Sequence, residues 1–360
     1  MISFLFFCTT TAMDSIISLS TLKNRLQLTA DELAFDEKKT HLPIRITEYY
    51  FNLIDKNDID DPLRRQVVPT RFEEDEQHWE NPDPLAEVNH SVTDRLIHRY
   101  KSRVAFLVTD ICPQYCRHCF RRRFTGTFQG NATQGQIQEA AFYCAEHPEV
   151  TEILLTGGDM MTLSDQMIDM MITTFRKARP DLIIRLCTRI CATYPQRITD
   201  NLIAVFKKHT SAPFYLMTQF NHCRELTGQA IEAVAKFVDN GIPAMNQSVL
   251  LHGVNDDATT LETLCNKLLA NRIKPYYLFQ GDLVSGTDHF RVPIEKGMAL
   301  EQELRRRLSG LAMPAYVADL PEGGGKVPLS KSYIKDYNGS GSWTFETCEG
   351  QVRYYQDPKC

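Results

Sequence analysis

The stretch that decides the fold is Val104–Cys119, VAFLVTDICPQYCRHC. Its first six residues form a short apolar run ending in Thr109, which is typical of a buried strand. Its last eight residues hold three cysteines with the spacing C-x3-C-x2-C. A buried strand that runs straight into a cysteine loop predicts a site at the carboxyl end of that strand.

Similar apolar runs recur along the chain and alternate with amphipathic stretches. The six runs are Val104–Thr109, Glu152–Thr156, Leu182–Thr188, Phe214–Thr218, Met245–Leu251 and Lys274–Phe279. Strands that alternate with helices predict a parallel sheet with right-handed crossovers. Because no clear seventh or eighth unit follows, we expect an α/β fold with a partial, open barrel whose chemistry lies at the carboxyl ends of its strands.

Two of the intervening helices have recognisable ends. A helix is predicted over Asp165–Ala178 with Ser164 as its N-cap, and another over Gly228–Asn240 with Thr227 as its cap. Gly241 fits the position at which the second helix would stop.

The three cysteines, Cys112, Cys116 and Cys119, fit an iron–sulfur cluster. Three thiolates can hold three irons of a four-iron cluster, and the fourth iron then keeps a position for the amino and carboxylate groups of S-adenosylmethionine (SAM). Zinc remains an alternative, but it usually takes four protein ligands and no second cysteine pair lies nearby. A chance grouping is the third interpretation.

A glycine pair follows the second predicted strand, in Thr156-Gly157-Gly158-Asp159. Glycines at a strand end let the backbone approach a ligand closely, here the amino end of SAM. The alternative is a plain strand-to-helix turn.

A glycine-rich loop near the C-terminus, Asp319–Pro328, reads DLPEGGGKVP. It is not a phosphate-binding P-loop, because Val327 stands where that motif needs Ser or Thr. Three glycines predict a loop that presents Lys326, and a lysine amine that forms a Schiff base is the usual anchor of pyridoxal phosphate (PLP). The alternative is a surface turn with a solvated lysine.

Composition adds limits to these interpretations. The 360 residues carry a net charge of -5, which gives no support for a nucleic-acid surface, and 43% of them are hydrophobic. Eleven cysteines without a regular disulfide spacing indicate metal binding or catalysis in a reducing compartment.

The opening MISFLFFCTTTAM lacks a basic region, so we expect a late start at Met13, or a frayed terminus, rather than a signal peptide.

Together these residues resemble the lysine 2,3-aminomutase family. The resemblance runs from about Ile46 to Tyr333 and rests on long motifs: HRYKSRVAFLVTDICPQYCRHCFRRRFTG, LLTGGD, PQRITD, NQSVLLHGVND, PYYLFQGDL, HFRVPIEKG and DLPEGGGKVP. It implies a radical SAM enzyme with a partial (β/α)6 barrel that interconverts L-lysine and β-lysine by 1,2-amino migration. The implied cofactors are a [4Fe-4S] cluster, SAM and PLP.

The resemblance also implies roles for single residues. Lys326 aligns with the lysine that binds PLP, Arg121 with the clamp for the substrate α-carboxylate, and Asp282 and Asp319 with the carboxylates that hold the distal ammonium. The remaining implied contacts are with the PLP phosphate, from Arg99, Tyr100 and Arg103, and with SAM, from Gly157, Gly158, Asp159 and Gln247. For the arginines a surface salt bridge is the alternative, and for the amide and carboxylates a capped loop.

Several positions depart from the family pattern. Asp257 stands where a zinc-binding cysteine is common, and the C-terminus holds only Cys348 and Cys360, which puts the family's structural zinc and its domain-swapped contact in doubt. Gln219 replaces a common histidine near SAM. Glu322 replaces a glycine and would add negative charge beside Lys326.

We therefore expect a mostly helical N-terminal extension (residues 1–98), a barrel core (99–310) and a C-terminal segment with the PLP lysine (311–360). The alternatives are an aminomutase for ornithine, arginine or glutamate, an enzyme that makes β-lysine to modify a translation factor, and a non-catalytic zinc or cluster protein. The translation-factor branch tends to lack a GGGK loop. The resemblance further implies a flavodoxin or ferredoxin as electron donor, a homo-oligomer and a cytoplasmic location, with no nucleic-acid or membrane partner.

Overall fold

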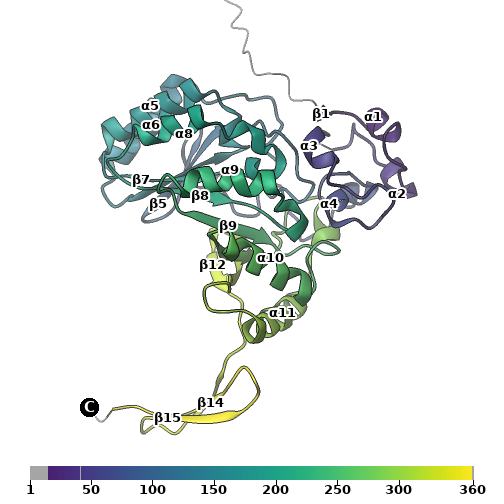
Figure 1. The fold of residues 1–360 in the computed structure, drawn as a ribbon. Helices are drawn as coiled ribbons and strands as arrows, with labels where there is room; N and C mark the ends of the chain where they lie inside the picture. Colours follow the sequence, from purple (N-terminus) through teal and green to yellow (C-terminus); the bar gives the residue numbers. More distant parts are fainter. Residues whose placement is uncertain (1–14, 41, 359–360) are drawn as a thin grey trace, which may run out of the picture.

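The computed structural model describes residues 15–40 and 42–358, and it is dominated by one open ten-stranded sheet (Figure 1). Seven consecutive strands of this sheet are parallel: β5 (Arg103–Thr109), β6 (Glu152–Gly157), β7 (Ile183–Cys187), β8 (Phe214–Thr218), β9 (Ala244–Val249), β10 (Ile273–Phe279) and β11 (Ala315–Leu320). Antiparallel strands complete both edges, namely β3 (Ser91–Thr93) and β4 (Leu96–Tyr100) at one and β12 (Gly325–Pro328) at the other. The predicted partial barrel is confirmed, and the structure adds a seventh parallel strand, β11, that the sequence interpretation missed.

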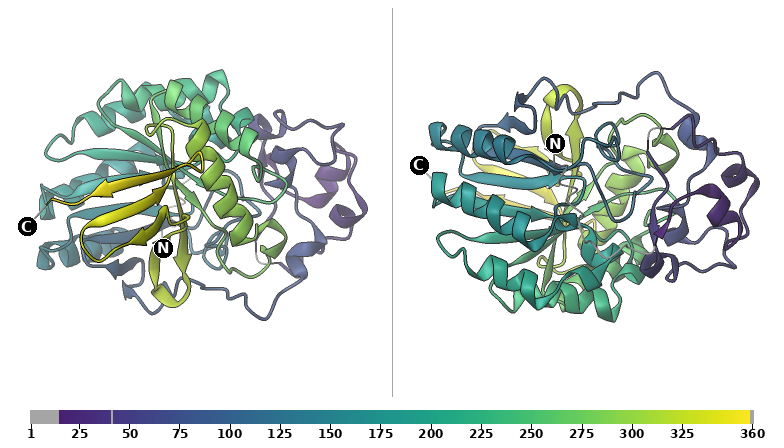
Figure 2. Two further views of the ribbon diagram at one scale, coloured as in Figure 1. Left: turned by 90° about the horizontal axis from the view of Figure 1, so that it is seen from below. Right: turned by 90° about the horizontal axis from the view of Figure 1, so that it is seen from above.

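Helices cover the outer face of the curved sheet (Figure 2). They are α5 (Gln134–Glu146), α6 (Asp165–Ala178), α7 (Ile190–Thr193), α8 (Asp200–Lys207), α9 (Gly228–Val238), α10 (Ala258–Ala270) and α11 (Ile294–Arg307). The predicted caps are confirmed, because the side chain of Ser164 accepts a hydrogen bond from Met167 N and that of Thr227 from Ala230 N. Helix α9 ends two residues earlier than predicted, and Gly241 follows it with a φ of 80°.

The alternation of side chains along each strand separates the core from the site. On β5, Phe106 is buried against the helices, where its ring lies 5.7 Å from that of Phe175 on α6. The alternate residues Arg103 and Ala105 face the inner side and line a cavity. Because successive strand residues point to opposite faces, the same strands build the core and supply the site.

The N-terminal extension consists of short elements packed around a core of their own. These are β1 (Ser15–Ile16), α1 (Leu19–Lys23), α2 (Ala30–Leu33), β2 (Ile46–Thr47), α3 (Glu48–Phe51) and α4 (Pro62–Arg65). Tyr50, Phe51 and Leu63 are fully buried in this cluster. The stretch MISFLFFCTTTAM and the proposed start at Met13 lie outside the described residues.

The C-terminal residues form a separate antiparallel sheet of β13 (Ile334–Tyr337), β14 (Ser342–Glu346) and β15 (Val352–Gln356), which projects from the body (Figure 1). The proposed boundary at residues 98 and 99 falls within β4, and the Lys326 strand β12 is hydrogen-bonded to β11. The division into residues 1–98, 99–310 and 311–360 therefore remains a proposal. None of the helices that the structure describes has the length and apolarity needed to span a membrane.

Candidate active site

A cavity of about 400 Å³ lies on the inner side of the barrel. It is lined by residues of every parallel strand from β5 to β11 and of the edge strands β4 and β12. The structure brings all predicted site residues to this one cavity: Arg99, Tyr100, Arg103, Cys112, Cys116, Cys119, Arg121, Gly157, Gly158, Asp159, Gln247, Asp282, Asp319 and Lys326. The cysteine loop and the lysine therefore share one chamber, although they are separated by about two hundred residues of sequence.

The cysteine loop is held from outside by the N-terminal extension. Arg45 Nη1 donates to the carbonyl of Cys112 at 3.2 Å, and the Tyr115 amide donates to the Arg45 carbonyl at 3.0 Å. The Arg117 amide donates to the Gln66 carbonyl at 2.8 Å. The extension is thus part of the scaffold of the site.

A buried charge cluster strengthens this attachment. The fully buried Glu73 accepts from Arg117 Nη2 at 2.6 Å and from Arg122 Nη2 at 2.5 Å. Burial opposes the charge of Glu73, but Arg117 and Arg122 together outweigh it and hold the pKa of this carboxyl below its ordinary value. Removing one partner of such a buried group typically costs about 3–5 kcal/mol.

The three thiols do not form a site for a single metal ion in the part of the chain that the structure describes. Among the described residues, no group of three or more His, Cys, Asp or Glu side chains is gathered tightly enough to hold a single metal. In a cluster each thiolate binds its own iron, so its cysteines need not converge on one point. Burial raises the pKa of the thiols of Cys112 and Cys116, so metal binding there has to displace protons.

Polar atoms beside the cysteines fit a polar ligand. Gln114, His118, Arg189 and Thr218 all line the cavity, and each carries a buried side-chain nitrogen or oxygen with no hydrogen-bond partner in the described residues. Such atoms are costly unless something pairs with them. This donor and acceptor set fits the amino-acid end of SAM next to a cluster.

The glycine pair after β6 packs against the cysteine loop. Gly158 N donates to the Thr109 carbonyl at 2.6 Å, and Asp159 N to the Ile111 carbonyl at 2.9 Å. A Cβ on Gly158 would lie 2.4 Å from the Ile111 carbonyl oxygen, and Gly157 has a φ of 113°. The close approach that requires glycine is therefore to the loop backbone, whereas the sequence interpretation assigned it to a ligand.

Asp159 is held by the chain itself. Its carboxylate accepts from the Thr188 hydroxyl at 2.6 Å, from Met161 N at 3.0 Å and from Arg189 N at 2.8 Å. These contacts join the ends of β6 and β7. Asp159 lines the cavity, but in this geometry its carboxylate orients the residues after β7.

At the other end of the cavity, Lys326 lies directly opposite Asp319 in the antiparallel pair β11–β12. Its Nζ contacts Asp319 Oδ2, and Arg99 Nη2 donates to Asp319 Oδ1 at 2.5 Å. Lys326 is thus part of a strand rather than the tip of a glycine loop. The turn before it contains Glu322 with a φ of 56°, whose exposed side chain does not line the cavity, so the expected charge effect of Glu322 on the site is not supported.

Aromatic and cationic side chains surround the lysine. The Arg103 guanidinium lies 3.7 Å from the centre of the Tyr100 ring, and that of Arg99 lies 4.6 Å from it. Lys326 Nζ lies 5.4 Å from the ring centre of Phe279. An amine, two guanidiniums, a phenol and a flat apolar wall fit the aldehyde, phosphate and ring of PLP.

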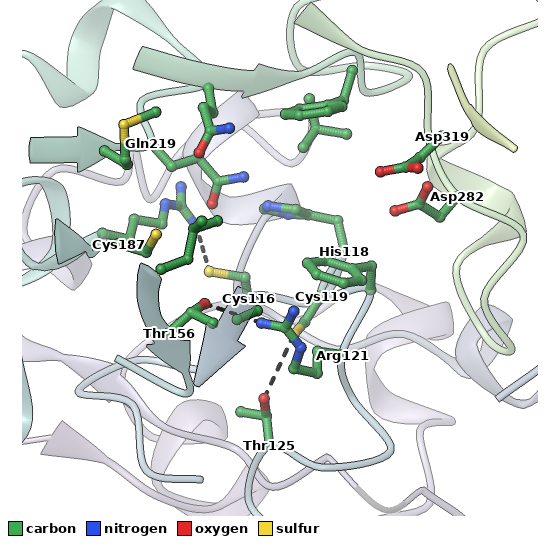
Figure 3. A pocket seen from close by; sticks show the side chains of 18 of the residues that line it. Cys116, His118, Cys119, Arg121, Thr125, Thr156, Cys187, Gln219, Asp282 and Asp319 are labelled. Carbon is green, nitrogen blue, oxygen red and sulfur yellow. Dashed lines mark hydrogen bonds between the residues drawn. The ribbon is translucent and has the colours of Figure 1, made fainter. Parts of the chain in front are cut away.

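Asp282 and Asp319 lie next to each other on this wall (Figure 3). Burial, followed by the negative charge of Asp319, raises the pKa of Asp282 to about 7. No donor in the described residues hydrogen-bonds to the Asp282 carboxylate. A half-buried carboxylate that accepts no hydrogen bond favours a cationic partner.

Arg121 is oriented by a partner that the sequence interpretation missed. Glu87 accepts from Arg121 Nη2 at 2.6 Å and from its Nε at 3.0 Å, while Nη1 donates to the Thr156 hydroxyl at 3.1 Å. This leaves the edge between Nη1 and Nη2 for a second carboxylate. Both Arg121 and Glu87 line the cavity.

The structure also places the other positions that the sequence analysis named. Asp257 is the N-cap of α10 and accepts from Thr260 N at 2.9 Å. Gln219 and Gln247 both line the cavity. Cys348 lies within the C-terminal sheet region, and Cys360 lies outside the described residues.

Comparisons with known proteins agree with this arrangement. Residues 106–264 match the family model of the radical SAM superfamily, and residues 301–360 match the model described as lysine-2,3-aminomutase. The chain is 39% identical over 317 residues to the L-lysine 2,3-aminomutase of Clostridium subterminale, covering 88% of this chain and 76% of that protein. It is 37% identical to the L-lysine 2,3-aminomutase of Bacillus subtilis, covering 96% and 73% of the two chains. It is also 38% identical to the glutamate 2,3-aminomutase of Clostridioides difficile, covering 95% and 80%.

Proposed function

Since the chain belongs to the lysine 2,3-aminomutase family, whose members are radical SAM isomerases that use a [4Fe-4S] cluster, SAM and PLP, we propose that it interconverts L-lysine and β-lysine. The observation that carries the proposal is that the cysteine triad and Lys326 line the same cavity. The proposed cluster site and the proposed PLP site therefore open into one chamber. That is the requirement for a radical formed at the cluster to act on a substrate held at the lysine.

The cofactors supply the hydrogen-abstracting radical and the ring that delocalises the unpaired electron during amino migration. The proposed assignments give the protein the tasks of binding and orientation. Cys112, Cys116 and Cys119 hold the cluster, and Lys326 anchors PLP. The other assignments are the phosphate site (Arg99, Tyr100, Arg103), the SAM site (Gly157, Gly158, Asp159, Gln247) and the substrate site (Arg121, Asp282, Asp319).

The electrostatics of the cavity favour a substrate with a carboxylate at one end and a cation at the other. The Arg121 guanidinium keeps one edge toward the chamber, which suits the bidentate grip of an α-carboxylate. Asp282 accepts no hydrogen bond in the described residues, and an incoming ammonium would stabilise its ionised form. Glutamate offers a second carboxylate instead and would meet Asp282 with like charge. Ornithine and arginine fit the same charge pattern and remain the alternative substrates.

We also propose a one-electron donor of the flavodoxin or ferredoxin type, a homo-oligomeric state and a cytoplasmic location. The donor is proposed because a four-iron cluster has to be reduced before it can cleave SAM. The location is proposed because the nine cysteines among the described residues are all unpaired, which suits a reducing compartment.

The test is conversion of isotopically labelled amino acids by protein reconstituted with iron, sulfide and PLP, then reduced in the presence of SAM. We expect β-lysine from lysine, and no product from a Cys116→Ala variant. Conversion of glutamate or ornithine without formation of β-lysine would reassign the substrate. A protein that binds neither iron nor PLP would contradict the enzyme assignment altogether.

A further inference from the structure

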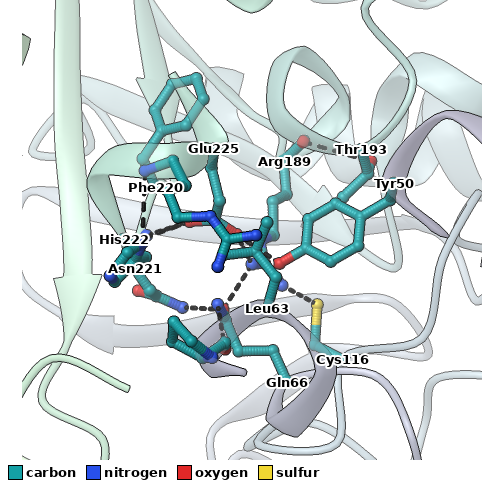
Figure 4. A network of polar contacts seen from close by, with 12 residues as sticks. Tyr50, Leu63, Gln66, Cys116, Arg189, Thr193, Phe220, Asn221, His222 and Glu225 are labelled. Carbon is teal, nitrogen blue, oxygen red and sulfur yellow. Dashed lines mark hydrogen bonds and ion pairs between the residues drawn. The ribbon is translucent and has the colours of Figure 1, made fainter. Parts of the chain in front are cut away.

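Arg189 is a buried arginine at the carboxyl end of β7 that contacts one of the three cysteines (Figure 4). Its Nη1 donates to Cys116 Sγ, while its Nη2 donates to Glu225 Oε1 and, at 2.6 Å, to Gln66 Oε1. Neither the cysteine spacing nor the family motifs quoted above single out this residue. Its guanidinium therefore links a proposed cluster ligand to a polar network outside the cavity.

The network fixes where the guanidinium points. Glu225 also accepts from the Tyr50 hydroxyl at 2.7 Å and from the backbone amides of Asn221 and His222 at 2.6 and 2.9 Å, so four donors share its carboxylate. The backbone of Arg189 is held separately, because its amide donates to Asp159. With its backbone and its side chain both tied down, Arg189 has little freedom to leave Cys116.

The chemistry of an arginine beside a thiolate is electrostatic. An arginine stays cationic in a protein, and a buried charge acts through a lower dielectric than one in water. A reduced cluster carries one more electron than an oxidised cluster, so a nearby cation and an N–H···S hydrogen bond both stabilise the reduced form. Only 8% of the Arg189 surface is exposed, so solvent screens this effect weakly.

The contact is confined to one corner of the triad. Among the described residues, no other arginine or lysine side chain hydrogen-bonds to the sulfur of Cys112, Cys116 or Cys119. The Cys119 sulfur has only a long contact of 3.9 Å with the Thr125 hydroxyl. The charge of Arg189 would therefore act on a bound cluster through Cys116.

We propose that Arg189 is a positioning residue that raises the reduction potential of the iron–sulfur cluster through Cys116, and that Glu225 and Gln66 keep it in place. This inference rests on the proposed function, because it takes the three cysteines as the cluster ligands. It assigns the N-terminal extension a part in the redox site, since Gln66 and Tyr50 both belong to that extension.

The test compares the wild-type protein with Arg189→Gln and Arg189→Lys, each reconstituted with iron and sulfide but without SAM. Iron content is measured for each, and the reduction potential is obtained from a redox titration followed by electron paramagnetic resonance. We expect unchanged iron content, a more negative potential for Arg189→Gln, and a smaller shift in the same direction for Arg189→Lys. The matched control is Arg176→Gln, because Arg176 is another buried arginine but donates to the carbonyls of Leu182 and Ala212 and does not line the cavity. This control should keep the wild-type potential.

A wild-type potential in an Arg189→Gln protein with full iron content would overturn the inference, and so would loss of iron from both Arg189 variants, which would mean a structural role. If only the Arg189→Gln variant loses iron, the reduction potential of the Arg189→Lys variant is the test. A wild-type potential in that variant would also overturn the inference. A wild-type protein that takes up no iron would refute the proposed function itself.

Discussion

The carboxylate of Glu87 holds the guanidinium of Arg121 along one edge, with Oε1 2.6 Å from Nη2 and Oε2 3.0 Å from Nε. Both side chains are buried, and the pair joins the N-terminal extension, which contains Glu87, to the loop after the cysteines, which contains Arg121. Burial opposes the charge of Glu87, but Arg121, with Arg123 and Arg99, holds the pKa of this carboxyl below its ordinary value. Arg121 thus enters the cavity already oriented.

Glu87→Gln should weaken binding of the amino acid substrate. The amide keeps the volume of Glu87 but loses one of the two charge-assisted contacts, so the guanidinium is held less firmly. We expect an apparent affinity about tenfold lower, equivalent to about 1.4 kcal/mol, with unchanged iron content. Asp181→Asn, which alters an exposed ion pair with Arg179, is the control and should bind like the wild type. Equal or tighter binding by Glu87→Gln would remove Glu87 from this role.

Asp282→Asn should stabilise the cofactor-free protein at high pH. The pKa of Asp282 is raised to about 7, whereas the pKa of an aspartate in an unfolded chain is about 3.9. The folded state therefore binds the proton more tightly, and wild-type stability falls as the pH rises from about 4 to about 7. Asn avoids this loss, so the gain should reach at most about 4 kcal/mol at pH 8 and should disappear below about pH 4.

Urea unfolding of the two proteins at several pH values measures this difference. Asp94→Asn is the control, because Asp94 is exposed and does not line the cavity. A pH-independent difference between Asp282→Asn and the wild type would show that Asp282 does not titrate in this range. The same variant should bind lysine more weakly, because it lacks the negative charge that faces the distal ammonium.

Local pattern was sufficient to predict most of the barrel. The six predicted strands begin and end within two residues of the observed ones, because alternation and apolar runs are properties of short segments. Strand β11 was missed because only Tyr316, Val317 and Ala318 of its six residues are buried, which leaves an apolar run too short to distinguish from a loop.

The residues of the site likewise include some that the sequence predicts and some that it does not. The motif-bearing residues were predicted because they are contiguous with recognisable sequence patterns. Arg189 and Glu87 were missed because their partners lie 73 and 34 positions away. The arrangement of the barrel strands brings Arg189 to Cys116, and the packing of the extension against the barrel brings Glu87 to Arg121. No periodicity encodes such a pair. The contact of Gly158 with Ile111 was not predicted for the same reason, since Ile111 lies in the loop after another strand.

Gly158→Ala should therefore disrupt the cysteine loop. Its Cβ would lie 2.4 Å from the Ile111 carbonyl oxygen, a backbone atom that cannot rotate away. We expect a loss of about 1–3 kcal/mol in stability, together with loss of most of the bound iron after reconstitution. Gly228→Ala is the matched control, because a Cβ there meets nothing within 4 Å, and it should be neutral or slightly stabilising. Full iron content in Gly158→Ala would contradict the packing argument.

Lys326→Ala should abolish covalent capture of PLP while leaving the cluster intact. Incubation of the wild-type protein with PLP, followed by borohydride, should fix a pyridoxyl group on Lys326, which peptide mass mapping can locate. The iron content of the variant should match that of the wild type, because Lys326 lies on the β11–β12 wall and has no hydrogen bond to the cysteine loop. Lys331→Ala is the control: Lys331 follows on the same segment but pairs with Glu346 at 3.1 Å and does not line the cavity. Because Asp319 and the Tyr100 and Phe279 rings surround only Lys326, an adduct on Lys331, or an undiminished adduct in Lys326→Ala, would mean that PLP binds elsewhere.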